Sequence, residues 1–215
     1  MSKTSSDKGP NFKNCTQIAT IIVGEEKKEW MIPTDLLCFH SGYFRSALRG
    51  GFAEAMTGRV ELLNEKPSTF ELIIEWLYSH KIKERDPIAS FEELMPCFRV
   101  LLEAYILAEY LQMPELQNIL MKFLNDRVAK HKYVSESDFA WAFAQVGPEN
   151  PLGWWTIMSC SQVMEISDLF VDDLVEAGAT VLLGEILQTI AGIEPLMTRF
   201  KLDDTFLVEK FNSED

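Results

Sequence analysis

The sequence predicts an α+β fold, in which a small three-stranded sheet near the front of the chain is wrapped by helices and followed by an all-helical C-terminal extension. Runs of β-branched and alternating apolar residues are confined to the first third of the chain. From Tyr133 onward, apolar residues recur at helical spacing only. With 215 residues, 47% of them hydrophobic and 25% charged, the chain can bury a sizeable core.

Three segments predict the strands of the sheet. Residues 17–24 and 29–33 are apolar or β-branched, and the charged run Glu25–Lys28 between them favours a hairpin. Residues 59–63 predict a third strand, because Val60 and Leu62 alternate with polar neighbours.

Capping residues predict where the first helices begin. Thr34-Asp35 offers capping oxygens for a short helix, and Ser41 caps a second one that Gly50-Gly51 ends. Ser68-x-x-Glu71 has the form of a capping box in front of a clear 3.6-residue period. Further helices are predicted over residues 97–111, 114–125, 137–146, 151–164, 169–177 and 181–193.

Composition divides the chain into four parts: a flexible leader (1–16), a mixed domain (17–125), a helical extension (126–205) and a frayed tail (206–215). The first 124 residues carry 14 basic and 17 acidic groups, whereas the remainder carries 6 and 16. We expect the extension to dock on the helix over 114–125, because short helices of this kind bury little surface alone.

The charge balance indicates what the protein does not bind. A net charge of -13 repels nucleic acid and anionic lipid surfaces. No signal peptide or membrane-spanning stretch is recognisable, and the cysteines are far apart, which favours a cytoplasmic or nuclear protein.

Chemistry-bearing residues do not cluster along the sequence. His40, His80 and His131 are scattered, so no metal site is expected, and the isolated glycines predict no nucleotide cofactor. A hydrolase using Cys160 or Ser161 remains as the enzyme hypothesis, but no base is positioned beside either residue. We therefore expect no enzyme and no cofactor.

An aromatic concentration in the extension allows two interpretations, a buried core or a binding hot spot, and helical spacing favours the core. Its members are Phe139, Trp141, Phe143, Trp154 and Trp155.

A series of short motifs resembles the BTB/POZ domain, particularly its fungal branch, over residues 18–125. The motifs occur in the family's order: Ile22–Gly24, Trp30–Leu37, Ser41–Phe44, Gly50–Ala55, Val60–Leu62, Phe70-Glu71, Glu75–Tyr78 and Tyr105–Leu111. Two departures stand out. Pro33 replaces a family histidine, and Ala19-Thr20 replaces an aspartate associated with some dimers.

The resemblance implies a non-catalytic protein–protein interaction module that self-associates as a homodimer and binds client proteins as an adaptor or scaffold. It implies self-contact through the first two helices, at Leu36, Leu37, Phe39, Tyr43 and Phe44. It also implies that Phe52, Ala53 and Glu54 match the hydrophobic-x-Glu motif with which related adaptors engage a cullin scaffold of a ubiquitin ligase.

Two alternatives stay open at this point. The chain could be a self-assembling or transcription-associated scaffold with no ubiquitin-ligase role. Alternatively, within the motif itself, Phe52 packs inward and Glu54 only caps the turn after Gly50-Gly51.

Overall fold

The computed structural model describes residues 17–82, 95–131, 136–163, 172, 175 and 179–190. The predicted leader, the predicted tail and most of the helix predicted over 169–177 lie outside the described residues. The chain divides into two compact units, one formed by Met1–Ile82 with Leu107–Met113, the other by Lys83–Ile106 with Pro114–Asp215.

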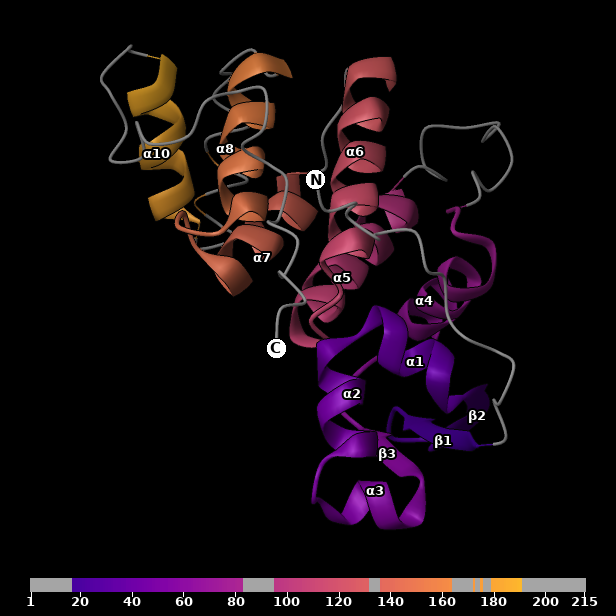
Figure 1. The fold of residues 1–215 in the computed structure, drawn as a ribbon. Coiled ribbons are helices and arrows are strands. Elements are labelled where there is room, and N and C mark those ends of the chain that lie inside the picture. Colours follow the sequence, from indigo (N-terminus) through magenta and orange to yellow (C-terminus); the bar gives the residue numbers. More distant parts are fainter. Residues whose placement is uncertain are drawn as a thin grey trace, which may run out of the picture. The chain divides into compact units, whose positions relative to one another are not determined.

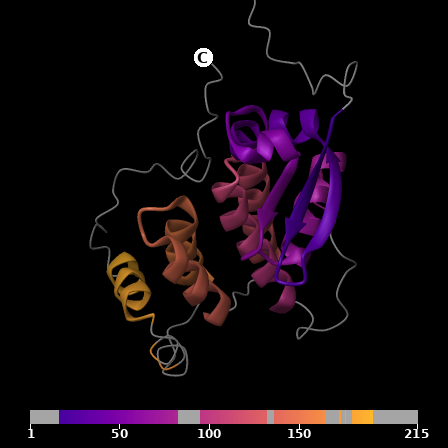
Figure 2. The same ribbon diagram turned by 90° about the horizontal axis from the view of Figure 1, so that it is seen from below.

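The sheet of the first unit has the three predicted strands, β1 (Ile18–Val23), β2 (Lys28–Pro33) and β3 (Arg59–Leu62). Their order is β2-β1-β3, with β1 antiparallel to β2 and parallel to β3 (Figure 2). The hairpin prediction is therefore confirmed. In β3, Val60 and Leu62 are buried and alternate with exposed neighbours, which agrees with the alternating sequence.

In the described part of the first unit, this sheet is accompanied by α1 (Thr34–His40), α2 (Gly42–Arg49), α3 (Ala53–Thr57) and α4 (Pro67–Ser79) (Figure 1). The core of this unit contains four fully buried large side chains, with an exposed fraction of 0%: Leu37, Phe44, Phe70 and Trp76. Their long apolar side chains supply much of the hydrophobic free energy that holds the helices to the sheet.

Two of the predicted helix caps are wrong. No side-chain hydrogen bond caps α1 or α4. Asp35 pairs instead with Arg49 at the end of α2, and Glu71 pairs with Lys28 at the start of β2. The two carboxylates predicted to cap helices therefore form ion pairs with basic side chains from distant parts of the chain.

The helices described in the second unit are α5 (Met95–Tyr110), whose last turn belongs to the first unit, α6 (Pro114–His131), α7 (Glu136–Val146), α8 (Pro151–Val163) and α10 (Thr180–Ile190). Helices α7 and α8, and α8 and α10, pack side by side (Figure 1). No helix among the described residues is long and apolar enough to cross a membrane.

Aromatic side chains form the core of the second unit. The Phe139 ring lies 5.7 Å from that of Phe98 on α5 and 5.1 Å from that of Trp155 on α8. Trp155 also reaches α6, because its Nε1 donates to Asn125 Oδ1 at 3.5 Å. The core interpretation is thus correct for these residues, and the extension helices α7 and α8 dock on α5 and α6.

Candidate interaction surface

An exposed apolar surface surrounds the short helix α3. The chain leaves α2 through Gly50-Gly51, and Phe52 then holds the N-cap position with extended backbone angles. Gly58 caps the C-terminal end of α3, and its φ of 65° is the left-handed conformation that glycine adopts without strain. Because the helix has only five residues, it has no buried side chain of its own.

Phe52 and Met56 project from this segment into solvent, with exposed fractions of 62% and 91%. They are four positions apart, Phe52 at the N-cap and Met56 in the last turn of α3. A Cβ on Gly50 would lie 3.1 Å from Phe52 Cδ2, so one edge of the Phe52 ring rests on Gly50. The alternative that Phe52 packs inward is therefore wrong.

Glu54 lies between these two residues in the sequence and is half-buried. Its backbone carbonyl accepts the N–H of Gly58 at 2.8 Å, which closes the helix. Ala53, the middle residue of the predicted hydrophobic-x-Glu motif, is exposed. The three predicted residues Phe52, Ala53 and Glu54 thus lie together around the start of α3.

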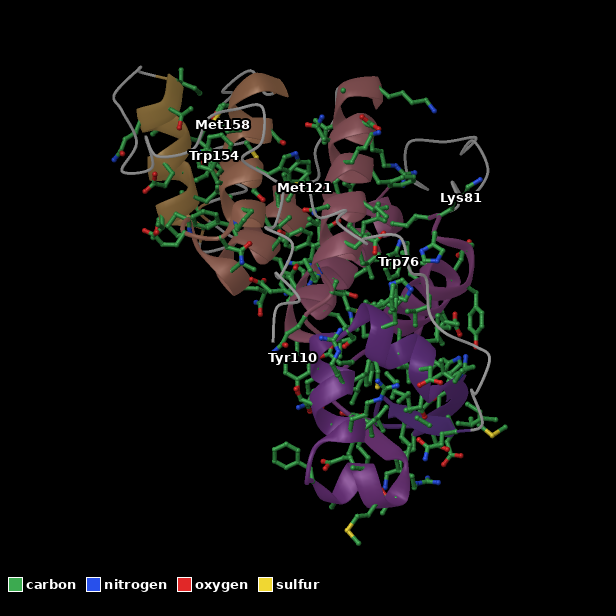
Figure 3. All side chains as sticks on the ribbon, in the orientation of Figure 1. Trp76, Lys81, Tyr110, Met121, Trp154 and Met158 are labelled. Atoms are coloured by element: carbon green, nitrogen blue, oxygen red, sulfur yellow. The ribbon has the colours of Figure 1, made fainter. Side chains whose placement is uncertain are left out.

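A tyrosine pair joins α2 to the end of α5 in the first unit. The rings of Tyr43 on α2 and Tyr110 at the end of α5 are 5.1 Å apart (Figure 3 labels Tyr110). Desolvation by burial raises the pKa of Tyr43 to about 12, and a hydrogen bond with Tyr110 and the negative charge of Glu54 act in the same direction.

The residues predicted for self-association separate into two groups. Leu36, Leu37 and Phe44 are buried, at 3%, 0% and 0% exposure, and contribute to the core of the first unit. Phe39 is 44% exposed and Tyr43 is half-buried, so these two are the side chains that a second copy could contact directly.

The histidines are less scattered than the sequence indicates. The His40 ring, at the end of α1, lies 5.1 Å from that of His80, which follows α4. No group of three or more His, Cys, Asp or Glu side chains among the described residues could hold a metal ion. Any metal bound by this pair would therefore have only two protein ligands from it.

The residues of the hydrolase hypothesis lie inside α8. Cys160 is buried, with 1% of its surface exposed, and the Ser161 hydroxyl donates to the Ile157 carbonyl at 2.7 Å. Cys38 is also buried, and desolvation raises the pKa of its thiol, which lowers its reactivity as a nucleophile.

Sequence reasoning missed Met56 and Tyr110 as members of this surface. The spacing of Phe52 and Met56 was the available signal for Met56, but α3 is too short to show a helical period. Tyr110 carries no local signal, because its proximity to Tyr43 arises from the tertiary fold.

Comparison with known proteins identifies the first part of the chain. No curated protein matches this sequence. The BTB/POZ domain family matches residues 12–127, which are more than half of the chain and include the sheet, α1 to α4, α5 and most of α6. The chain belongs to the BTB/POZ domain family.

Proposed function

We propose that this BTB/POZ protein is an adaptor that joins a cullin-type scaffold to a client protein and self-associates as a homodimer. BTB/POZ domains are protein–protein interaction modules, and the first unit has an exposed apolar surface of the kind such a module needs. The finer resemblance to the fungal branch rests on the sequence motifs alone.

The exposure of Phe52 is the observation that carries the cullin proposal. Large aromatic side chains are typical hot spots of binding, and Phe52 is 62% exposed, as Met56 is also exposed in the same short segment. Glu54 adds a carboxylate next to these apolar groups, so the surface fits an apolar anchor with a basic or hydrogen-bond-donating neighbour. The short helix α3 displays all three groups within five residues.

Binding of a cullin N-terminal domain by the full chain tests this proposal. Phe52→Ala should weaken binding by about 2 kcal/mol, because truncation removes a central aromatic contact. The same variant should unfold at the wild-type denaturant concentration, since Phe52 is largely solvated in the free protein.

Met31→Ala is the matched control for this experiment. Met31 lies on β2 and is 76% exposed, so its truncation removes similar apolar surface from another part of the first unit. Equal affinities of the wild type, Phe52→Ala and Met31→Ala, or no binding by the wild type, would reject the adaptor proposal and favour a scaffold without a ligase role.

We propose that Phe39 and Tyr43 make the contacts of self-association. The buried Leu36, Leu37 and Phe44 hold α1 and α2 in the core of the first unit. Light scattering should return about twice the chain mass of 24.6 kDa. Phe39→Asp should shift the protein to the monomer, because an unpaired carboxylate in an apolar contact is strongly unfavourable. Tyr78→Asp, at a 59% exposed position of α4, should leave the mass unchanged.

A further inference from the structure

Helix α10 presents apolar side chains to solvent beside the face that packs on α8. Leu182 and Ile186 are buried, and α10 lies next to α8 in Figure 1. Leu187 and Ile190 are 45% and 48% exposed, and Leu183 is half-buried. Leu183, Leu187 and Ile190 occupy positions i, i+4 and i+7, so they form one stripe along the helix, which we call the α10 flank.

The composition of α10 is unusual for a helix with a solvent-exposed side. Of the residues Thr180–Ile190, only Glu185 is charged. A helix face that stays in water usually carries several charged side chains, whereas a stripe of aliphatic side chains is typical of a face that contacts another element. We therefore expect a second element to cover the α10 flank.

We propose that residues 195–202 dock on the α10 flank as a short amphipathic helix. They follow α10 in the chain and lie outside the described residues. Their sequence predicts one apolar face, because Leu196, Met197 and Phe200 occupy positions i, i+1 and i+4 of a helix, whereas Thr198 falls on the opposite side. Contact between this face and the α10 flank removes both apolar surfaces from water.

The connection between α10 and residues 195–202 is short enough to fold them back on the helix. Only residues 191–194 separate Ile190 from Pro195, and helix–helix connections commonly have about two to eight residues. Gly192 suits the end of one helix, and Pro195 suits the first position of the next. A short tether gives an effective concentration on the order of 1 mM, far above that of a second copy in a micromolar solution. Residues 195–202 therefore occupy the flank in preference to a second copy.

Charge complementarity favours the same residues. Residues 133–198 contain acidic side chains but no lysine, arginine or histidine. Arg199 and Lys201 are the first basic residues after Lys132. Both lie beside the apolar face of the predicted helix, so docking brings two positive charges to an acidic extension without burying either charge.

Hydrogen exchange of the full chain, followed by mass spectrometry of peptides from α10, tests the docking. Phe200→Asp places a carboxylate in the apolar contact and should make the α10 amides exchange about tenfold faster. Phe211→Asp makes the same change outside residues 195–202 and should leave the exchange of α10 as in the wild type. Equal exchange of α10 in the wild type and Phe200→Asp, or equal acceleration by both variants, would overturn the proposal.

Substitutions on α10 provide the reciprocal measurement. Leu187→Asp and Val181→Asp add the same charge at exposed positions, but Val181, which is 62% exposed, lies off the α10 flank. Leu187→Asp should accelerate exchange in residues 195–202, and Val181→Asp should not. Equal effects of the two variants would contradict the docking.

Dilution of the wild-type protein distinguishes the tethered segment from a second copy. A contact within one chain does not depend on protein concentration, so dilution by about a hundredfold should leave the exchange of α10 unchanged. Faster exchange on dilution would identify a second copy as the occupant of the flank, and the proposal would then be wrong.

Discussion

The Ser41 hydroxyl donates to the Leu111 carbonyl at 2.6 Å and also accepts the N–H of Phe44 at 3.0 Å. One side chain thus caps α2 and ties its first turn to the residue that follows α5. Nearby, the N–H groups of Gly42 and Tyr43 donate to the carbonyls of Gln112 and Leu111. The start of α2 therefore meets the end of α5, an arrangement in which the two helix dipoles attract.

Replacing Ser41 with alanine should lower the free energy of unfolding by about 2 kcal/mol, because a cap is lost and buried polar groups lose their partner. Ser41 is completely buried, so water cannot take its place without rearrangement. Ser46→Ala, on the exposed side of the same helix, is the control and should change stability by less than about 0.5 kcal/mol. Urea denaturation measures both, and equal midpoints for the two variants would contradict the prediction.

Arg99 connects α5 to the extension helix α7. Its guanidinium lies 3.6 Å from the centre of the Trp141 ring and pairs with Asp138 at 3.3 Å and with Glu103 at 3.0 Å. Arg99→Ala should lower the free energy of unfolding of the second unit by about 1–2 kcal/mol. Arg99→Lys should recover little of this loss, since an ammonium group cannot stack as the planar guanidinium does.

Arg59→Ala is the control for this measurement. The Arg59–Glu29 pair lies on the sheet with both side chains about half exposed, at 49% and 53%. Such a pair is worth less than about 1 kcal/mol. If thermal denaturation gives the same loss for Arg59→Ala and Arg99→Ala, the stacking contact with Trp141 contributes nothing.

The sequence was sufficient to predict those elements that depend on local patterns. The alternation around Val60 predicted β3, and the charged run before Lys28 predicted the turn of the hairpin. The capping predictions failed where a distant charge competed, since the carboxylate of Glu71 pairs with Lys28, 43 positions away. Local spacing contains no information about such a partner.

The candidate site shows the same division. The family resemblance located Phe52 to Glu54, because their neighbours form a recognisable local motif. The approach of Tyr43 to Tyr110, and of His40 to His80, joins residues that are 67 and 40 positions apart in the sequence. These contacts follow from the tertiary packing of helices, which no single periodic pattern predicts.

The pKa of Tyr43 predicts a stability change at high pH. The value of about 12 in the folded protein exceeds the ordinary value of 10.0. Between these two values the folded state keeps a proton that the unfolded state has lost, so stability must fall as pH rises from 10 to 12. The contribution is fully present below pH 10 and is lost above pH 12.

Tyr43→Phe isolates this effect, because phenylalanine keeps the ring and has no titrating group. The stability difference between the wild type and Tyr43→Phe should shrink as pH rises through this range, as measured by urea midpoints. The comparison reports on the Tyr43–Tyr110 pair as a whole, because Tyr43→Phe also removes the hydrogen bond between these two side chains. Parallel curves for the two proteins would contradict the assigned pKa.

Replacement by alanine should change stability in opposite directions at two helical glycines, Gly153 and Gly184. Gly153 in α8 packs against the turn that follows α7, where Gly147 has a φ of 72°. A Cβ on Gly153 would lie 1.9 Å from the Gly147 carbonyl oxygen, a backbone atom that cannot rotate away. At Gly184 in α10, by contrast, an added Cβ meets no atom within 4 Å.

Gly153→Ala should therefore lower the free energy of unfolding by about 3 kcal/mol, because the turn after α7 must move to admit the methyl group. Gly184→Ala should raise it by about 0.5–1 kcal/mol, since alanine favours the helix and restricts the unfolded chain. Chemical denaturation followed by tryptophan fluorescence reports on both, because Trp154 and Trp155 adjoin Gly153 in α8. Stabilisation by both substitutions would mean that α7 and α8 do not pack as closely as Gly147 and Gly153 indicate.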